Sequence, residues 1–134
     1  MKKVLGLLFV AFLFIGCDNK DVATQMEDIK QGKNSFIIAK NKIGKEPMVL
    51  EIGASSCQSC IDMKKLIANL KQQNSTLPIY VVDVYDDRTA FSYFKIQLIP
   101  TQIVFNKEGQ EVYRHIGKLN REELLALVEM SKTK

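Results

Sequence analysis

The sequence predicts an α/β fold in which a central β-sheet is covered by helices on both faces. Segments with helical and strand-like periodicity alternate from residue 35 onward, which is typical of a sheet covered by helices. One strand-like segment, residues 47–54, is apolar on both alternating faces, as expected for a strand in the middle of such a sheet. The 134 residues leave room for a single domain of this kind.

Composition excludes several classes of protein. With 46% apolar and 25% charged residues, the chain should bury an ordinary core, so it is neither disordered nor fibrous. Its 19 basic and 15 acidic residues give a net charge of only +4, and they are spread along the chain. Because binding to a phosphate backbone needs clustered Lys and Arg, we expect no nucleic-acid partner.

The first elements of the domain follow from the spacing of apolar residues. Residues 35–43 predict a helix capped by Ser35, although residues 36–38 alone would also fit a strand. The buried strand of residues 47–54 follows and contains one charged residue, Glu51. A second helix over residues 57–73 is indicated by apolar positions at spacings of three, four and three: Cys60, Met63, Ile67 and Leu70.

The second half of the domain continues the alternation. A buried strand over residues 78–84 precedes a short helix over 89–95, and residues 101–105 and 111–116 predict a β-hairpin. Asn120 caps the last helix in a capping-box arrangement with Glu123. The acidic residues between the second strand and the short helix are expected to border a solvated loop: Asp83, Asp86 and Asp87.

The N-terminus predicts export and a lipid anchor. Two lysines precede the apolar residues 4–15, a run too short for a spanning helix, which needs about 20 apolar residues, but within the about 7 to 15 of an export signal. The residues that follow, Phe14-Ile15-Gly16-Cys17, resemble the bacterial lipobox, with Phe14 in place of the usual leucine. This resemblance implies a lipoprotein signal peptide over residues 1–16 and lipidation of Cys17. Ordinary signal cleavage nearby, or an uncleaved short anchor, remains open.

The expected mature chain is a polar tether over residues 17–34 followed by a domain over residues 35–134. Export would place the domain in the bacterial periplasm, attached to a membrane through its lipid. Proteins in such a compartment meet oxidising conditions, so the two remaining cysteines should be able to form a disulfide.

These two cysteines, Cys57 and Cys60, lie at the predicted junction between the buried strand and the second helix. A cysteine on the first turn of a helix meets unpaired N–H groups and the positive end of the helix dipole, which favour its thiolate. The thiolate is the reactive form of cysteine, so we assign Cys57 as the nucleophile and Cys60 as the thiol that resolves the mixed disulfide.

Two other uses of the pair are weaker. A structural zinc site needs four ligands, and the chain offers only Cys57, Cys60 and His115 once Cys17 carries lipid. A purely structural disulfide between positions this close in sequence would restrict the unfolded chain very little and would add little stability. Redox chemistry is therefore the favoured use.

At this point the chain resembles the thioredoxin superfamily, over about residues 35–130. The matching pieces are residues 49–51 before Cys57-Gln58-Ser59-Cys60, then Ile99-Pro100-Thr101 ahead of the hairpin, and Ile116-Gly117 before the last helix. The resemblance implies a central mixed sheet with helices on both faces. It also implies that Pro100 is cis beside the disulfide, and that Ile99, Pro100 and Thr101 shape the edge on which a substrate docks. The tryptophan that usually precedes the first cysteine is replaced by Ser56.

Glu51 stands where thioredoxins have a buried Asp and where several membrane-tethered cytochrome-maturation relatives have Glu. A carboxyl group in a central strand is costly to ionise, so we expect a raised pKa and a role in taking the proton of Cys60. The alternative is a side chain that reaches solvent beyond the end of the strand.

The resemblance implies a membrane-anchored thiol-disulfide oxidoreductase, more a reductase than an oxidase, because the short interval between Cys60 and Pro100 cannot hold the helical insertion of the strong periplasmic oxidases. No cofactor is expected. The implied partners are disulfide-containing exported proteins, apocytochrome c among them, and a membrane protein that supplies electrons.

Two alternatives from other classes stay open. A copper-handling protein of the same fold would bind Cu(I) through Cys57, Cys60 and His115. A noncatalytic lipoprotein would carry a vestigial cysteine pair. Outside the copper hypothesis, we expect the lone histidine, His115, to be an exposed polar residue on the hairpin.

Overall fold

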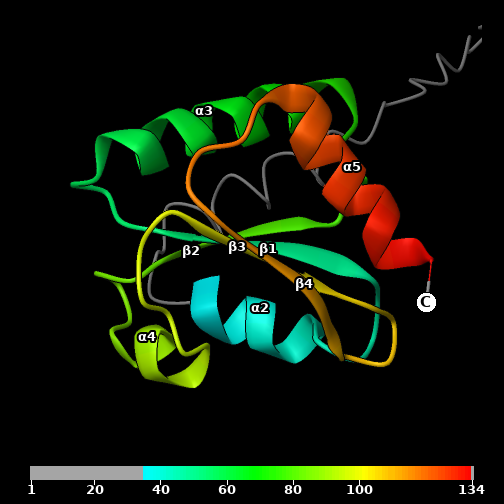
Figure 1. The fold of residues 1–134 in the computed structure, drawn as a ribbon, viewed down its shortest axis with the longest axis horizontal. Coiled ribbons are helices and arrows are strands. Elements are labelled where there is room, and N and C mark those ends of the chain that lie inside the picture. The colour runs from blue at the N-terminus through cyan, green and yellow to red at the C-terminus, as the bar shows by residue number, and fades with distance from the viewer. Residues whose placement is uncertain (1–34, 134) are drawn as a thin grey trace, which may run out of the picture.

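The computed structural model of the chain describes residues 35–133 and contains one four-stranded sheet in the order β2-β1-β3-β4 (Figure 1). Strand β1 (Met48–Gly53) is parallel to β2 (Ile79–Asp83) and antiparallel to β3 (Thr101–Phe105), which pairs antiparallel with β4 (Glu111–Ile116). The sheet is therefore mixed, as the sequence predicts. The predicted signal peptide, Cys17 and the tether lie outside the described residues.

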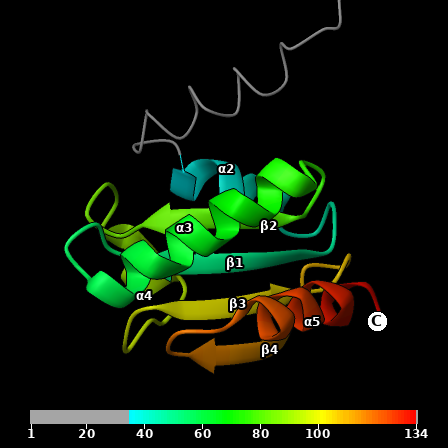
Figure 2. The same ribbon diagram turned by 90° about the horizontal axis from the view of Figure 1, so that it is seen from above.

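Within residues 35–133, four helices cover the two faces of the sheet. Helices α3 (Gln58–Gln73) and α5 (Arg121–Lys132) lie on one face, and α2 (Ser35–Lys42) and α4 (Thr89–Tyr93) lie on the other (Figures 1 and 2). None of the helices within residues 35–133 is long and apolar enough to cross a bilayer.

The side chains of β1 alternate between two apolar clusters, one on each face. Met48, Leu50 and Ile52 join the cluster covered by α2 and α4, whereas Val49 joins the cluster formed with α3 and α5. All six residues of β1 are buried, as predicted for a central strand. This alternation places Val49, Glu51 and Gly53 on the face of α3.

The predicted elements are confirmed with small shifts at their ends. Helix α3 begins at Gln58, with Cys57 as its N-cap. Helix α4 ends at Tyr93, shortly before Lys95 adopts a φ of 52°, a left-handed conformation that a helix cannot continue through. The capping box of Asn120 and Glu123 at the start of α5 is present.

One sequence expectation needs a correction. Asp83 is the last residue of β2 and borders a loop in which Asp86 is exposed, but its own side chain is not solvated: it is 8% exposed and accepts a 2.6 Å contact from Lys64 Nζ of α3. Its other carboxylate oxygen accepts a hydrogen bond from the backbone N–H of Tyr85. The carboxylate thus fixes the start of the segment that leads to α4.

Candidate active site

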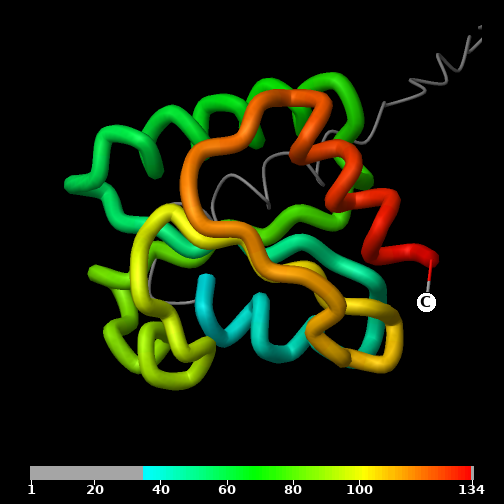
Figure 3. The backbone as a smooth tube through the Cα atoms, viewed as in Figure 1, coloured from blue at the N-terminus to red at the C-terminus, as the bar shows by residue number. Residues whose placement is uncertain are grey.

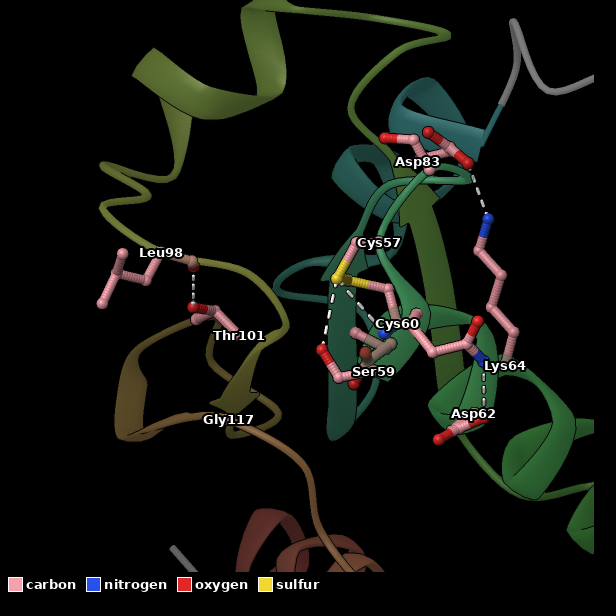
Figure 4. Close-up of a disulfide and its surroundings, with 12 residues drawn as sticks. Cys57, Ser59, Cys60, Asp62, Lys64, Asp83, Leu98, Thr101 and Gly117 are labelled. Carbon is pink, nitrogen blue, oxygen red and sulfur yellow. Dashed lines mark hydrogen bonds and ion pairs between the residues drawn. A yellow bond between two sulfur atoms is a disulfide. The ribbon is translucent and has the colours of Figure 1, made fainter.

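The two cysteines lie at the N-terminus of α3 and are joined as a disulfide, with 5.2 Å between their Cα atoms (Figure 4). The Cys57 sulfur accepts a hydrogen bond from the backbone N–H of Cys60 and lies 3.2 Å from Ser59 Oγ. Cys57 is half-buried, whereas Cys60 is fully buried. This difference in access matches an attacking Cys57 and a resolving Cys60.

The lack of a side chain at Gly53 allows Cys60 to pack closely against β1. A Cβ atom at Gly53 would lie 2.8 Å from Cys60 Cβ and 3.1 Å from Cys60 Sγ, which is closer than such atoms pack. The last residue of β1 is therefore bare backbone beneath the resolving sulfur. Because side chains two residues apart on a strand share a face, the Glu51 side chain points to the same side of the sheet as Cys60.

The Ile99–Pro100 peptide bond is cis, as the resemblance implies. The carbonyl of Pro100 accepts a 2.8 Å hydrogen bond from the N–H of Gly117, and Thr101 Oγ1 donates to the carbonyl of Leu98 at 2.6 Å. Figure 3 follows the chain through these two segments, one before β3 and one after β4. In Figure 4, Leu98, Thr101 and Gly117 lie together on one side of the disulfide.

The edge near the cis proline is apolar and partly exposed. Leu98 is 63% exposed and Ile116 is 47% exposed, while Ile99 is half-buried and Pro100 is buried. Exposed apolar residues beside a reactive disulfide suit a surface that contacts another chain.

Glu51 is buried in the middle of the sheet, with 1% of its surface exposed, so the alternative in which it reaches solvent is wrong. Burial raises its pKa to about 8, while the hydrogen bond from Gln102 and the positive charge of Lys64 partly oppose the rise. A carboxyl group with this pKa exchanges its proton near neutral pH, which suits proton transfer at a cysteine pair.

Two residues of this site were not anticipated from the sequence. Gln102, on β3, is fully buried and donates a 2.7 Å hydrogen bond from Nε2 to Glu51 Oε2. Lys64, on α3, acts on Glu51 through its charge while it is paired with Asp83. A polar side chain directly before the apolar residues 103–105 of a predicted strand was a signal for the first. No pattern along the chain pointed to the second.

Ser56, which stands where the usual tryptophan precedes the first cysteine, is hydrogen-bonded to Tyr85 of the segment after β2. Ser56 Oγ donates a 2.9 Å hydrogen bond to the hydroxyl of Tyr85, whose side chain is 55% exposed. An exposed aromatic residue from the segment after β2 is therefore bonded to the residue that precedes Cys57.

His115 is half-buried on β4, opposite Gln102 in the register of β3 and β4. Within residues 35–133, no three His, Cys, Asp or Glu side chains gather in a group that could hold a metal ion. His115 thus does not join the two cysteines in the arrangement that the copper hypothesis needs.

Comparison with known proteins agrees with this geometry. The family described as thioredoxin matches residues 18–130. Thioredoxin H3 of Arabidopsis thaliana is 30% identical over 89 residues, covering 66% of this chain and 74% of the relative. Thioredoxin of Sus scrofa is 30% identical over 98 residues, covering 73% of this chain and 91% of the relative.

Solved structures show the same fold. Oxidized mitochondrial thioredoxin 3 from Saccharomyces cerevisiae superposes with a TM-score of 0.57 at 19% identity, over 71% of this chain and 88% of that one. Thioredoxin of Malassezia sympodialis has a TM-score of 0.57 at 21% identity, over 69% of this chain and 81% of that one.

Proposed function

The chain belongs to the thioredoxin family and is a thiol-disulfide oxidoreductase, and we propose that it acts in the bacterial periplasm as a lipid-anchored reductase of disulfides in exported proteins. The observation that carries the chemistry is the unequal pair at the start of α3, with Cys57 accessible and Cys60 buried. The location rests on residues 1–17, with their export-like apolar run and the cysteine of the lipobox-like segment.

The proposed reaction has two exchanges. The Cys57 thiolate attacks a substrate disulfide, a mixed disulfide forms, and the first substrate sulfur leaves as a thiolate that takes a proton from solvent. Cys60 then attacks the Cys57 sulfur and gives its proton to Glu51 while the second substrate sulfur leaves. The substrate gains two electrons, and the protein ends as the Cys57–Cys60 disulfide.

The substrate edge is formed by Ile99, Pro100 and Thr101, with the exposed Leu98 beside it. Exported proteins with accessible disulfides are the proposed substrates, and apocytochrome c is one of them. A membrane protein that carries reducing equivalents outward returns the pair to its dithiol form. No cofactor takes part in the exchange.

Trapping tests this function directly. In cells that express the full chain with Cys60→Ser, substrates should accumulate as mixed disulfides with Cys57, and dithiothreitol should release them. The Cys57→Ser/Cys60→Ser variant is the matched control and should trap nothing. A Cys60→Ser protein that captures no substrate would show that the pair is not catalytic in the cell.

The reductase direction and the anchor need separate measurements. The purified protein should reduce a model protein disulfide and have a reduction potential nearer thioredoxin, about −270 mV, than the strongest oxidants, about −120 mV. Cys17→Ser should move the protein from the membrane fraction to the soluble periplasmic fraction. A potential at the oxidant end, or an unchanged membrane association, would contradict the corresponding part of the proposal.

A further inference from the structure

Gln102 occupies an unusual place for an amide side chain. It lies in β3, directly opposite Glu51 of β1, and none of its surface is exposed. Its Nε2 atom donates to two acceptors: Glu51 Oε2 at 2.7 Å and the carbonyl oxygen of Gly117 at 3.2 Å. A buried amide is costly unless it is hydrogen-bonded, and here both N–H groups have acceptors close at hand.

The second acceptor connects this amide to the substrate edge. The N–H of Gly117 donates a hydrogen bond to the carbonyl of Pro100, and the carbonyl of Gly117 accepts a hydrogen bond from Gln102 Nε2. Gly117 has a φ of 116°, a conformation that disfavours any residue with a side chain. A continuous series of hydrogen bonds therefore runs from Pro100 through Gly117 and Gln102 to the carboxyl group of Glu51.

Within the described part of the chain, few other polar or charged side chains lie where they could interact with the carboxyl group of Glu51. Lys64 of α3 acts on Glu51 through its charge and is held by Asp83 of β2, and Cys60 of α3 packs over Gly53, two residues further along β1. The neighbouring β2 residue in register is Val81, and the side chains that α5 buries nearby include no charged group.

Among the described residues, one oxygen of the Glu51 carboxyl group and the oxygen of the Gln102 amide are buried without a hydrogen-bond partner. Oε1 of Glu51 and Oε1 of Gln102 find no hydrogen-bond partner within residues 35–133. His115 of β4 is the titratable residue beyond Gln102 in the same row of the sheet. Since Oε2 of Glu51 is engaged by the amide, Oε1 is the oxygen left to receive a proton.

We propose that Gln102 is a positioning residue of the exchange reaction: its amide holds Glu51 Oε2, leaves Oε1 to accept the Cys60 proton, and ties the carboxyl group to the docking segment through Gly117. No proton passes through Gln102. The amide donates an N–H to Oε2 throughout and favours the carboxylate, so it counteracts the effect of burial on Glu51. This inference rests on the proposed role of Glu51 as proton acceptor.

The first test needs no mutation. In the reduced full chain, the side-chain ¹⁵N and ¹H resonances of Gln102 should titrate together with the ¹³C signal of the Glu51 carboxyl group, with the same midpoint. The backbone N–H of Gly117 should follow with a smaller change. Gln102 resonances that stay constant while Glu51 titrates would overturn the inference.

The second test removes the donor. Gln102→Met, which keeps the length of the side chain but has no N–H, should move the Glu51 midpoint upward by about one pH unit, so that the carboxylate fraction at pH 7 falls about tenfold. Val104→Ala, on the same strand and face, is the matched control. It should lower stability while leaving the Glu51 midpoint unchanged.

The kinetics separate this inference from the proposed role of Glu51. The rate of Cys60 attack on a preformed mixed disulfide should shift along the pH axis in Gln102→Met, and the shift should vanish in the Glu51→Gln background. A shifted Glu51 titration without a kinetic change would contradict the role of Glu51 as proton acceptor, while still supporting the contact between Gln102 and Glu51. An unshifted titration in Gln102→Met would refute the positioning role itself.

Discussion

The two faces of the sheet differ in what they bury, although the same strands supply both. On the face of α2 and α4, the side chains of β1 meet a continuous apolar cluster. On the face of α3 and α5, apolar packing at one end of β1 gives way to Glu51, then Gly53 beneath Cys60. Both faces thus bury apolar clusters, but the face of α3 and α5 also buries a carboxyl group and the resolving thiol beside its cluster.

The largest expected effect breaks the apolar face. Leu50→Ala removes a fully buried side chain from the α2 and α4 cluster and should lower the free energy of unfolding by about 2–5 kcal/mol. Urea denaturation measures the loss. The pH dependence of Cys60 attack should not change, because Leu50 points away from α3. A shifted pH profile would show that the two faces are not separable.

The second prediction concerns the charge buried on the other face. Glu51 has a pKa of about 8 in the folded protein and about 4.5 when unfolded, so folding binds a proton between these values. Stability from this group is therefore complete below pH 4.5 and is lost as pH rises through 8, at about 1.4 kcal/mol per pH unit. Glu51→Gln should abolish this slope.

Urea denaturation at a series of pH values from 4.5 to 8 measures that slope. Glu46→Gln is the control, because this carboxyl is more exposed and its hydrogen bond from Tyr80 lowers its pKa. The control should retain the slope that Glu51 causes. Equal slopes in wild type and Glu51→Gln would contradict the raised pKa.

The third prediction adds one methyl group at the redox pair. Gly53→Ala places a Cβ atom 2.8 Å from Cys60 Cβ, so α3 or the strand must shift, and overpacking of this kind costs about 1–3 kcal/mol. Insulin reduction should slow as well. Ala54→Gly, at the next position, is the control for a change of backbone freedom. An unaltered Gly53→Ala protein would mean that Cys60 is not held tightly.

The smallest expected effect compares two ion pairs of α3. Lys64→Met breaks the partly buried contact with Asp83 and should cost about 1 kcal/mol or less, and it should raise the pKa of Glu51 by removing a positive charge. Lys118→Met breaks the exposed pair with Asp62 and should leave the Glu51 titration unchanged. NMR titration of both variants separates the two effects.

The local features of the fold were predictable because local chemistry determines them. Apolar spacing identified α3, and the residue pair Asn120 and Glu123 identified the start of α5. The burial of Glu51 was predictable in the same way, since its neighbours in β1 are apolar. The cis bond before Pro100 came from the family resemblance and not from the residues themselves.

The remaining parts of the site depend on which strand lies beside which. Gln102 faces Glu51 only because β3 pairs with β1 in one register, and a shift by one residue would turn its side chain to the other face. The burial of Asp83 depends likewise on Lys64 reaching across from α3. Spacing within one segment carries no information on either contact.

The complete burial of Cys60 beside the half-exposed Cys57 also has an analytical consequence. An alkylating reagent added to the reduced, folded protein should modify one thiol of this pair, and denaturant should reveal the second. The ratio of the two counts, read by mass spectrometry, therefore reports how often α3 lifts from the sheet. The labelling rate of Cys60 thus measures the rate of local opening at the redox centre.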